Sequence, residues 1–153
     1  MTSVLAVAIL ASGQQKLDPE IAKSYRLVQK ATLAKDVAQM RSLWKQYVDP
    51  SCTAQVEGQK LSSARLLALM EQQMSQIQKV SKCEITVLKF GKAKDTLVCT
   101  VKTSQASVFL INKKPVKFDG VTVAEDTWKK VGGKYKIVNI KVLSESRKTG
   151  SGK

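Results

Sequence analysis

The spacing of hydrophobic residues changes near Val80, about halfway along this 153-residue chain. Before Val80, apolar residues recur every three or four positions, which is typical of helices that bury one face. After Val80 they alternate with polar residues, which is typical of strands in a half-buried sheet. Helices followed by strands predict an α+β protein in which the helices cover one face of a mostly antiparallel sheet.

The clearest strand signal is the segment Val121–Leu143, where two β-rich runs meet at Gly132-Gly133. Glycines between two such runs predict a hairpin. The tail 144–153 is rich in Ser, Gly and Lys, which predicts a disordered basic tail. The sheet is expected to have four to six strands, drawn from 85–90, 96–102 continuing to 111 with a bend or bulge near 104–106, 116–130 and 135–143.

Three helices are predicted before the sheet. Asp18 caps the first, and a proline and a glutamate follow it in the first turn. Asp36 caps the second, and Pro50 stops it. Ser62 or Ser63 caps the third. This third helix is predicted to reach Ile77. The stretch 51–60, between the second and third helices, is predicted to be a loop or a minimal strand.

The composition excludes several kinds of chemistry. The chain has no histidine, so histidine triads, histidine metal sites and the commonest general acid or base at neutral pH are absent. Cys52, Cys83 and Cys99 form no C-x-x-C pair, which favours buried free thiols; one disulfide and a leftover thiol is the alternative for an exported chain. Neither a metal nor a cofactor is expected, and 43% hydrophobic residues suffice for one core.

Basic residues are concentrated in the strand half of the chain. Through Val80 there are 10 basic and 6 acidic residues, a net charge of +4, and from Ser81 onward there are 16 and 6, a net charge of +10. A field of this size attracts polyanions without defining a site. Because only 5% of residues are aromatic, few side chains are available to stack on bases. Nucleic-acid binding is therefore disfavoured, and a solvated basic surface is the simpler interpretation.

Residues 1–13 contain an apolar run from Val4 to Ala11 followed by small residues, which predicts a secretory signal cleaved before Gln14. No Lys or Arg precedes the run, so the alternatives are a truncated start or a short helix packed on the body. With a signal the protein is secreted or periplasmic, and without one it is cytoplasmic. The run is too short to span a bilayer, and no other segment reaches the required length.

Four stretches carry a resemblance to a known superfamily: A-K-D-V at 34–37, L-W-K-Q-Y-V-D at 43–49, Gly58, and above all D-T-W-K-K-V-G-G-K-Y-K-I-V-N at 126–139. Over roughly 18–143 the chain resembles the nuclear transport factor two-like superfamily, which includes ketosteroid isomerase and SnoaL-like cyclases. The resemblance implies a cystatin-like α+β roll, with three N-terminal helices packed in the concave face of a bent sheet. It also implies a cavity for an apolar ligand and a homodimer formed through the sheet.

The resemblance further implies where catalytic residues would lie. The base of the steroid isomerases, an aspartate shortly before the glycine that precedes helix three, corresponds to Gln55, and a neutral amide cannot take a proton. Glu57 is nearby and would face the opposite way in an extended segment. The oxyanion-donating tyrosine on helix one corresponds to Val28, one helical turn after Tyr25.

Asp126 is the residue that matches a catalytic position, two residues before Trp128. In an apolar cavity its pKa would rise and make it a neutral donor, whereas the alternative is a strand carboxylate paired with a nearby lysine. Trp128 is predicted to belong to the sheet core, and Thr122 and Ala124 share its face and are expected to form cavity wall.

With one of three catalytic positions matched, and without the histidine on which dehydratase-type sites rely, the sequence favours an exported binding domain over an enzyme. A small apolar ligand or a protein partner would bind through the cavity or the sheet. The alternatives are an isomerase or lyase using Asp126 with Glu57 or Tyr25 on an apolar substrate, and a basic accessory domain that binds a polyanion. The residues expected to contact the ligand are Tyr25, Val28, Trp44, Gln55, Met70, Asp126 and Trp128.

Overall fold

The computed structural model describes residues 16–151, so the predicted signal at 1–13 lies outside the described residues. Within this range three helices and six strands follow one another. Their bounds are α2 Pro19–Leu33, α3 Val37–Tyr47, β1 Val48–Val56, β2 Gln59–Ser62, α4 Ser63–Gln76, β3 Ile77–Ala93, β4 Thr96–Ile111, β5 Lys114–Val131 and β6 Lys134–Ser151.

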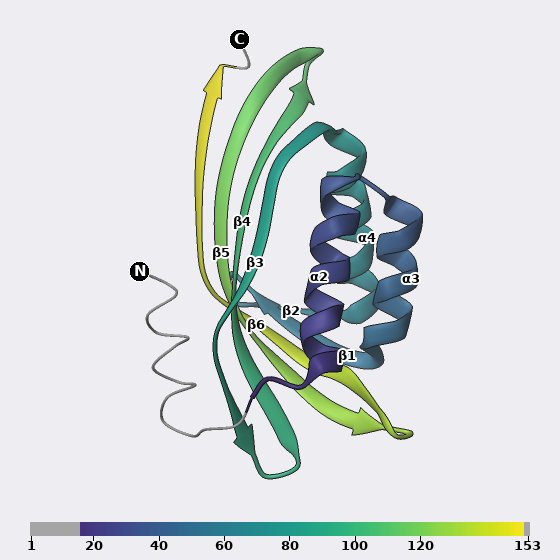
Figure 1. The fold of residues 1–153 in the computed structure, drawn as a ribbon. Helices are drawn as coiled ribbons and strands as arrows, with labels where there is room; N and C mark the ends of the chain where they lie inside the picture. The colour runs from purple at the N-terminus through teal and green to yellow at the C-terminus, as the bar shows by residue number, and fades with distance from the viewer. Residues whose placement is uncertain (1–15, 152–153) are drawn as a thin grey trace.

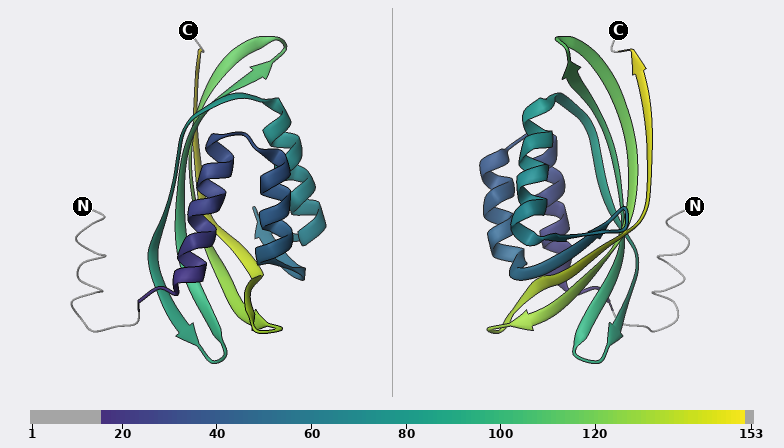
Figure 2. Two further views of the ribbon diagram at one scale, coloured as in Figure 1. Left: turned by 45° about the vertical axis from the view of Figure 1, so that its right-hand side comes forward. Right: turned by 180° about the vertical axis from the view of Figure 1, so that it is seen from behind.

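The strands form one mixed sheet in the order β2-β1-β6-β5-β4-β3. Neighbouring strands are antiparallel except for β1 and β6, which are parallel. The sheet is strongly bent, and α2, α3 and α4 all lie on its concave side (Figure 1, Figure 2). The predicted α+β roll, with three helices in the concave face of a mostly antiparallel sheet, is therefore confirmed.

The helices begin where the sequence predicts. The carboxylates of Asp18 and Asp36 and the hydroxyl of Ser62 each accept a backbone N–H of the following turn, at 2.8 to 3.2 Å. These bonds satisfy amides that have no partner within the helix. The third helix ends at Gln76 rather than at Ile77, because Ile77 already pairs with β4 and starts β3.

The strands are longer than the sequence predicts. The stretch 51–60 lies in a β1–β2 hairpin whose turn has positive φ at Glu57 and Gly58. The tail predicted to be disordered from Ser144 instead continues β6 to Ser151, because β5 supplies hydrogen-bond partners along that whole length. The bulge expected near 104–106 of β4 lies in the neighbouring strand, where the register of β3 shifts between Val80 and Lys82.

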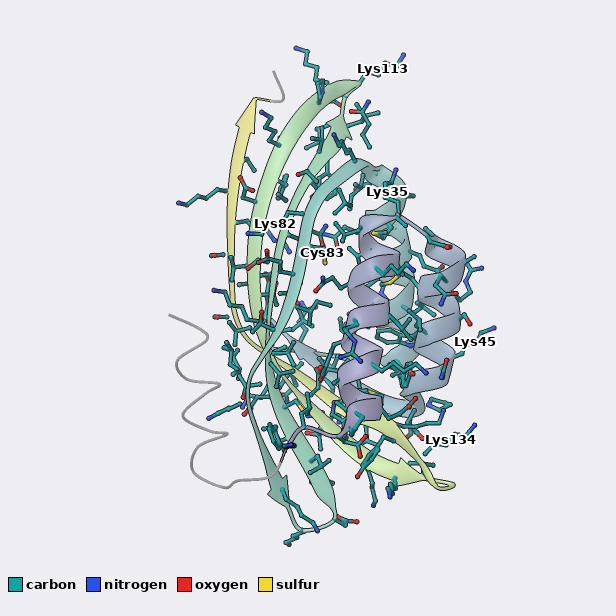
Figure 3. The ribbon with its side chains drawn as sticks, viewed as in Figure 1. Lys35, Lys45, Lys82, Cys83, Lys113 and Lys134 are labelled. Carbon is teal, nitrogen blue, oxygen red and sulfur yellow. The ribbon has the colours of Figure 1, made fainter. Side chains whose placement is uncertain are left out.

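Two clusters of buried side chains fill the space between helices and sheet. The larger includes Trp128, which is 1% exposed, and packs α2 and α3 against the sheet. The smaller surrounds Phe109 and Met74 where α4 meets β3 and β4. Cys83 points from β3 toward the helices, as Figure 3 shows. All three cysteines are buried free thiols, as predicted.

Among residues 16–151, no helix has the length and hydrophobicity that a membrane crossing requires.

Candidate functional site

A cavity of about 300 Å³ lies between the three helices and the inner face of the sheet. Its walls are predominantly apolar. The helices contribute Ser24, Tyr25, Val28, Met40, Leu43, Trp44, Tyr47, Leu66 and Met70. The strands contribute Val48, Ile85, Val101, Thr103, Thr122, Ala124, Asp126, Trp128, Ile137, Ile140 and Val142.

Simple periodicity places these side chains on the cavity. On α2, the cavity residues Tyr25 and Val28 follow the core residue Ile21 at intervals of four and three, so all three share the face that packs on the sheet. On β5, alternate residues from Thr122 to Trp128 face inward. The register then sets their neighbours: Asp126 lies between Cys99 of β4 and Ile140 of β6.

Three buried side chains close the inner end of the cavity through a chain of hydrogen bonds. The indole Nε1 of Trp128 donates to the hydroxyl of Tyr25 at 3.0 Å. That hydroxyl in turn donates to Oδ2 of Asp126 at 2.8 Å. The Tyr25 and Trp128 rings also pack edge to face, with centroids 5.8 Å apart. The polar groups at this end of the cavity are therefore oriented by hydrogen bonds among themselves.

The partner of Asp126 decides between the two interpretations of this residue. The alternative of a strand carboxylate paired with a lysine is wrong, because the partner is the phenol of Tyr25 on α2. Burial raises the pKa of Asp126 to about 6, and the hydrogen bond from Tyr25 opposes that rise. At neutral pH the side chain is mainly a carboxylate that accepts a hydrogen bond from the Tyr25 hydroxyl, and in mild acid it becomes a neutral donor.

The other titratable groups around the cavity keep their protons. Burial, followed by the nearby Asp126 carboxylate, holds the pKa of Tyr25 well above its ordinary value, so the phenol stays a donor. Burial also raises the pKa of Cys52 and of Cys99 to about 11. Reactive cysteines need a lowered pKa, so neither thiol is an activated nucleophile.

The structure brings together most of the residues that the sequence predicts. The cavity lining includes Tyr25, Val28, Trp44, Met70, Asp126 and Trp128. The indole of Trp44 is fixed by donation to the hydroxyl of Ser63 at 2.9 Å. Ligand contact by these residues remains a prediction, but their convergence on one space is a property of the fold.

Gln55 and Glu57 lie outside that lining, and both are exposed. Ala54 is the buried neighbour on β1, so the alternation of the strand turns Gln55 to the outer face. Thr53, on the same outer side, hydrogen-bonds Asn139 of β6. The face of β1 that meets the cavity is set by its pairing with β6. Because the paired residues lie more than 80 positions apart, the local sequence pattern does not predict this pairing.

Sequence reasoning missed the parts of the lining that come from β4 and β6. Val101 and Thr103 lie two and four residues beyond Cys99, in register with Ala124 and Thr122 of β5. Once Asp126 is paired with Cys99, every second residue along β4 faces inward, and this alternation identifies Val101 and Thr103. Within residues 16–151, no cluster of three or more potential metal-ligating side chains exists, so the cavity presents no metal centre there.

No family model matches the sequence, and no curated relative matches it. Solved structures do resemble the fold. An NTF2-like protein from Cytophaga hutchinsonii has a TM-score of 0.55 and 13% identity, over 84% of this chain and 99% of the other. An NTF2-like protein of unknown function in nutrient uptake from Rhodospirillum rubrum has 0.59 and 16%, over 80% and 95%. LinA has 0.65 and 12%, over 100% and 97%. At such identities the similarity is one of fold.

Proposed function

For a chain with the nuclear transport factor two-like fold, we propose that the cavity binds a small, predominantly apolar molecule. The observation that carries this proposal is the cavity of about 300 Å³ with apolar walls and a single carboxylate at its buried end. Small-molecule sites are typically concave and mostly apolar, with a few polar groups that fix orientation.

The polar end restricts what the ligand can be. An ionised carboxylate accepts several hydrogen bonds, so Asp126 retains capacity after it accepts from Tyr25. Burying a further polar group against it without a hydrogen bond would be costly. The ligand therefore carries a hydroxyl or N–H donor at the end that reaches Asp126, on an otherwise apolar body.

Tryptophan fluorescence provides a direct test, because both tryptophans of the chain, Trp44 and Trp128, line the cavity. Titration with an uncharged apolar probe, N-phenyl-1-naphthylamine, is expected to change tryptophan emission and to increase probe emission. Ala124→Leu fills the cavity and is expected to weaken probe binding at least fivefold. Ala106→Leu is the control, because Ala106 is an alanine of the same sheet outside the cavity lining.

Equal probe binding by wild type and Ala124→Leu would contradict the proposal. So would an Ala106→Leu variant that loses as much affinity as Ala124→Leu.

A second candidate is an isomerase or lyase of the ketosteroid-isomerase type, which is favoured by the surroundings of Asp126. Asp126 lines the cavity, its pKa is about 6, and Tyr25 beside it is a fixed donor. These are properties of a group that moves a proton near neutral pH. Glu57 takes no part in this version, because it lies at the exposed β1–β2 turn. Isomerisation of an apolar β,γ-unsaturated ketone that is lost in Asp126→Asn would support this candidate, and no turnover by wild type would exclude it for that substrate.

We further propose export, which rests on residues 1–13 alone. N-terminal sequencing of the protein recovered from its native cells tests it. A first residue at Gln14 in an extracytoplasmic fraction is expected, and an intact N-terminus in the cytoplasmic fraction would contradict export.

A further inference from the structure

The inward-facing residues change from apolar to polar at the same level on three neighbouring strands. A level is here a set of three inward-facing residues that are paired across β4, β5 and β6. The level next to Asp126 is fully apolar, and at the two levels after it every side chain is polar or absent. The successive levels across β4, β5 and β6 are Val101–Ala124–Val142, then Thr103–Thr122–Glu145, then Gln105–Gly120–Arg147. Because the change is in register on all three strands, it divides this part of the concave face into an apolar and a polar half. The polar half is bounded on its far side by Phe109 and Phe118.

The polar half has its own pocket of about 140 Å³. Thr103 and Thr122 line both this pocket and the apolar cavity, so the two spaces adjoin. The polar pocket lies between the last turns of α4 and the inner face of β4, β5 and β6. Gln73, near the end of α4, contributes a further amide.

Arg147 is the cation of this pocket, and its partner is Glu145. Nε and Nη2 of Arg147 both donate to Oε1 of Glu145, at 3.2 and 2.5 Å. This pairing occupies one edge of the guanidinium, and an arginine has five N–H donors. The Arg147 side chain is 52% exposed, so the other edge of its guanidinium is accessible to a second acceptor.

Gly120 leaves the floor between Gln105 and Arg147 without a side chain. A Cβ at this position would meet only the backbone oxygen of Ser146, at 3.9 Å, which is ordinary contact. Packing therefore does not require glycine here. The missing side chain at Gly120 leaves open the space between the side-chain donors of Gln105 and Arg147.

We propose that the ligand is an elongated amphiphile with an anionic head, a carboxylate, held over Gly120 by Arg147 and Gln105, and an apolar body in the cavity. This inference rests on the proposed binding function and adds the ligand's chemical class. The positive field of the strand half, net +10 from Ser81 onward, favours an anionic head over a cationic one.

The strand geometry sets the length of the ligand. The levels of Asp126 and Arg147 are six residues apart along β4, from Cys99 to Gln105. At ~3.3 Å per residue this is about 20 Å, the reach of a linear chain of about twelve carbons with a polar group at each end. One end meets Asp126 and the other meets Arg147.

Two probes that differ only in the head separate the halves of the site. 12-Hydroxydodecanoic acid carries both polar ends, and dodecan-1-ol lacks the carboxylate. In titrations of the full chain followed by tryptophan fluorescence, Arg147→Met is expected to weaken binding of the acid at least tenfold and binding of the alcohol less than twofold. Lys148→Met is the control, because it removes one positive charge from the next residue of β6, which faces away from the pocket.

A third variant moves the affinity in the opposite direction. Glu145→Gln removes the carboxylate that competes for Arg147, so it is expected to tighten binding of the acid and to leave the alcohol unchanged. A purely structural role of the Arg147–Glu145 pair would not produce that gain.

The outcomes separate this inference from the proposed function. If both probes bind at a site that Ala124→Leu blocks, but Arg147→Met affects them equally or not at all, the anionic-head inference is overturned and the binding function stands. If neither probe binds to wild type at a site that Ala124→Leu blocks, both are overturned.

Discussion

Tyr25 connects a helix to the sheet through a single buried hydroxyl group. The hydroxyl accepts from Trp128 and donates to Asp126, so one atom satisfies two buried polar partners. Leaving buried polar groups without partners costs more than the hydrogen bonds themselves contribute. The same atom thus stabilises the fold and opposes the rise that burial causes in the pKa of Asp126.

Tyr25→Phe is expected to lower the free energy of unfolding by about 1–3 kcal/mol, because it leaves Asp126 and the Trp128 indole without that partner. Tyr47→Phe is the matched control, since Tyr47 donates to the exposed Glu20 and also packs on Trp128. Denaturant unfolding measures both. A loss from Tyr47→Phe as large as that from Tyr25→Phe would contradict this assignment.

Asp126 also makes stability depend on pH. Its folded-state pKa of about 6 is above the ordinary 3.8, so its contribution is complete below pH 3.8 and is lost as the pH rises through 6. The loss amounts to about 3 kcal/mol, from roughly 1.36 kcal/mol per pH unit. Asp49, Glu71 and Asp95 have lowered pKa values and act with the opposite sign.

Unfolding of wild type and Asp126→Asn between pH 3.5 and 7 isolates this effect. The stability of wild type relative to the variant is expected to fall as the pH rises. A difference that is constant, or that increases with pH, would be inconsistent with a buried carboxyl of raised pKa.

At the scale of elements, local signals were sufficient for the helices and insufficient for the ends of the strands. Asp18, Asp36 and Ser62 cap their helices through bonds to residues two or three positions away, so sequence alone locates them. The composition of 144–151 is that of a disordered segment, yet pairing with β5 makes it a strand. Arg147 and the outward turn of Gln55 were missed for this reason, because both follow from non-local register.

Hydrogen exchange at residues 144–151 tests that reassignment. This part of β6 pairs with β5, whereas β1 is paired with β6 only as far as Lys141. In such an edge strand, alternate amides point to the neighbour and to solvent. Alternating slow and fast exchange is therefore expected along 144–151, and uniformly fast exchange would show that the segment is disordered as its composition suggests.

At the scale of the whole molecule, the inner and outer faces of the sheet differ in chemistry. The inner face carries the cavity. The outward positions of β5 include Val121, Val123 and Glu125, with Lys102 of β4 opposite Val123 and Lys141 of β6 opposite Glu125. A dimer through this face remains a prediction from the family resemblance. Like charges brought together would oppose it at low ionic strength, and salt would screen them.

Sedimentation of the full chain is expected to show more dimer at high than at low ionic strength, and Val121→Lys is expected to abolish the dimer. Val131→Lys, at the exposed end of β5, is the control. A monomer at every ionic strength would argue against association through the sheet.

A crystal structure of the full chain grown with dodecan-1-ol tests most directly whether the cavity ending at Tyr25, Asp126 and Trp128 is a ligand site. The expected result is electron density for the alkyl chain between Ala124 and Met70, with the hydroxyl hydrogen-bonded to Asp126. An empty cavity, or an alcohol bound only elsewhere on the protein, would contradict a ligand site in this cavity.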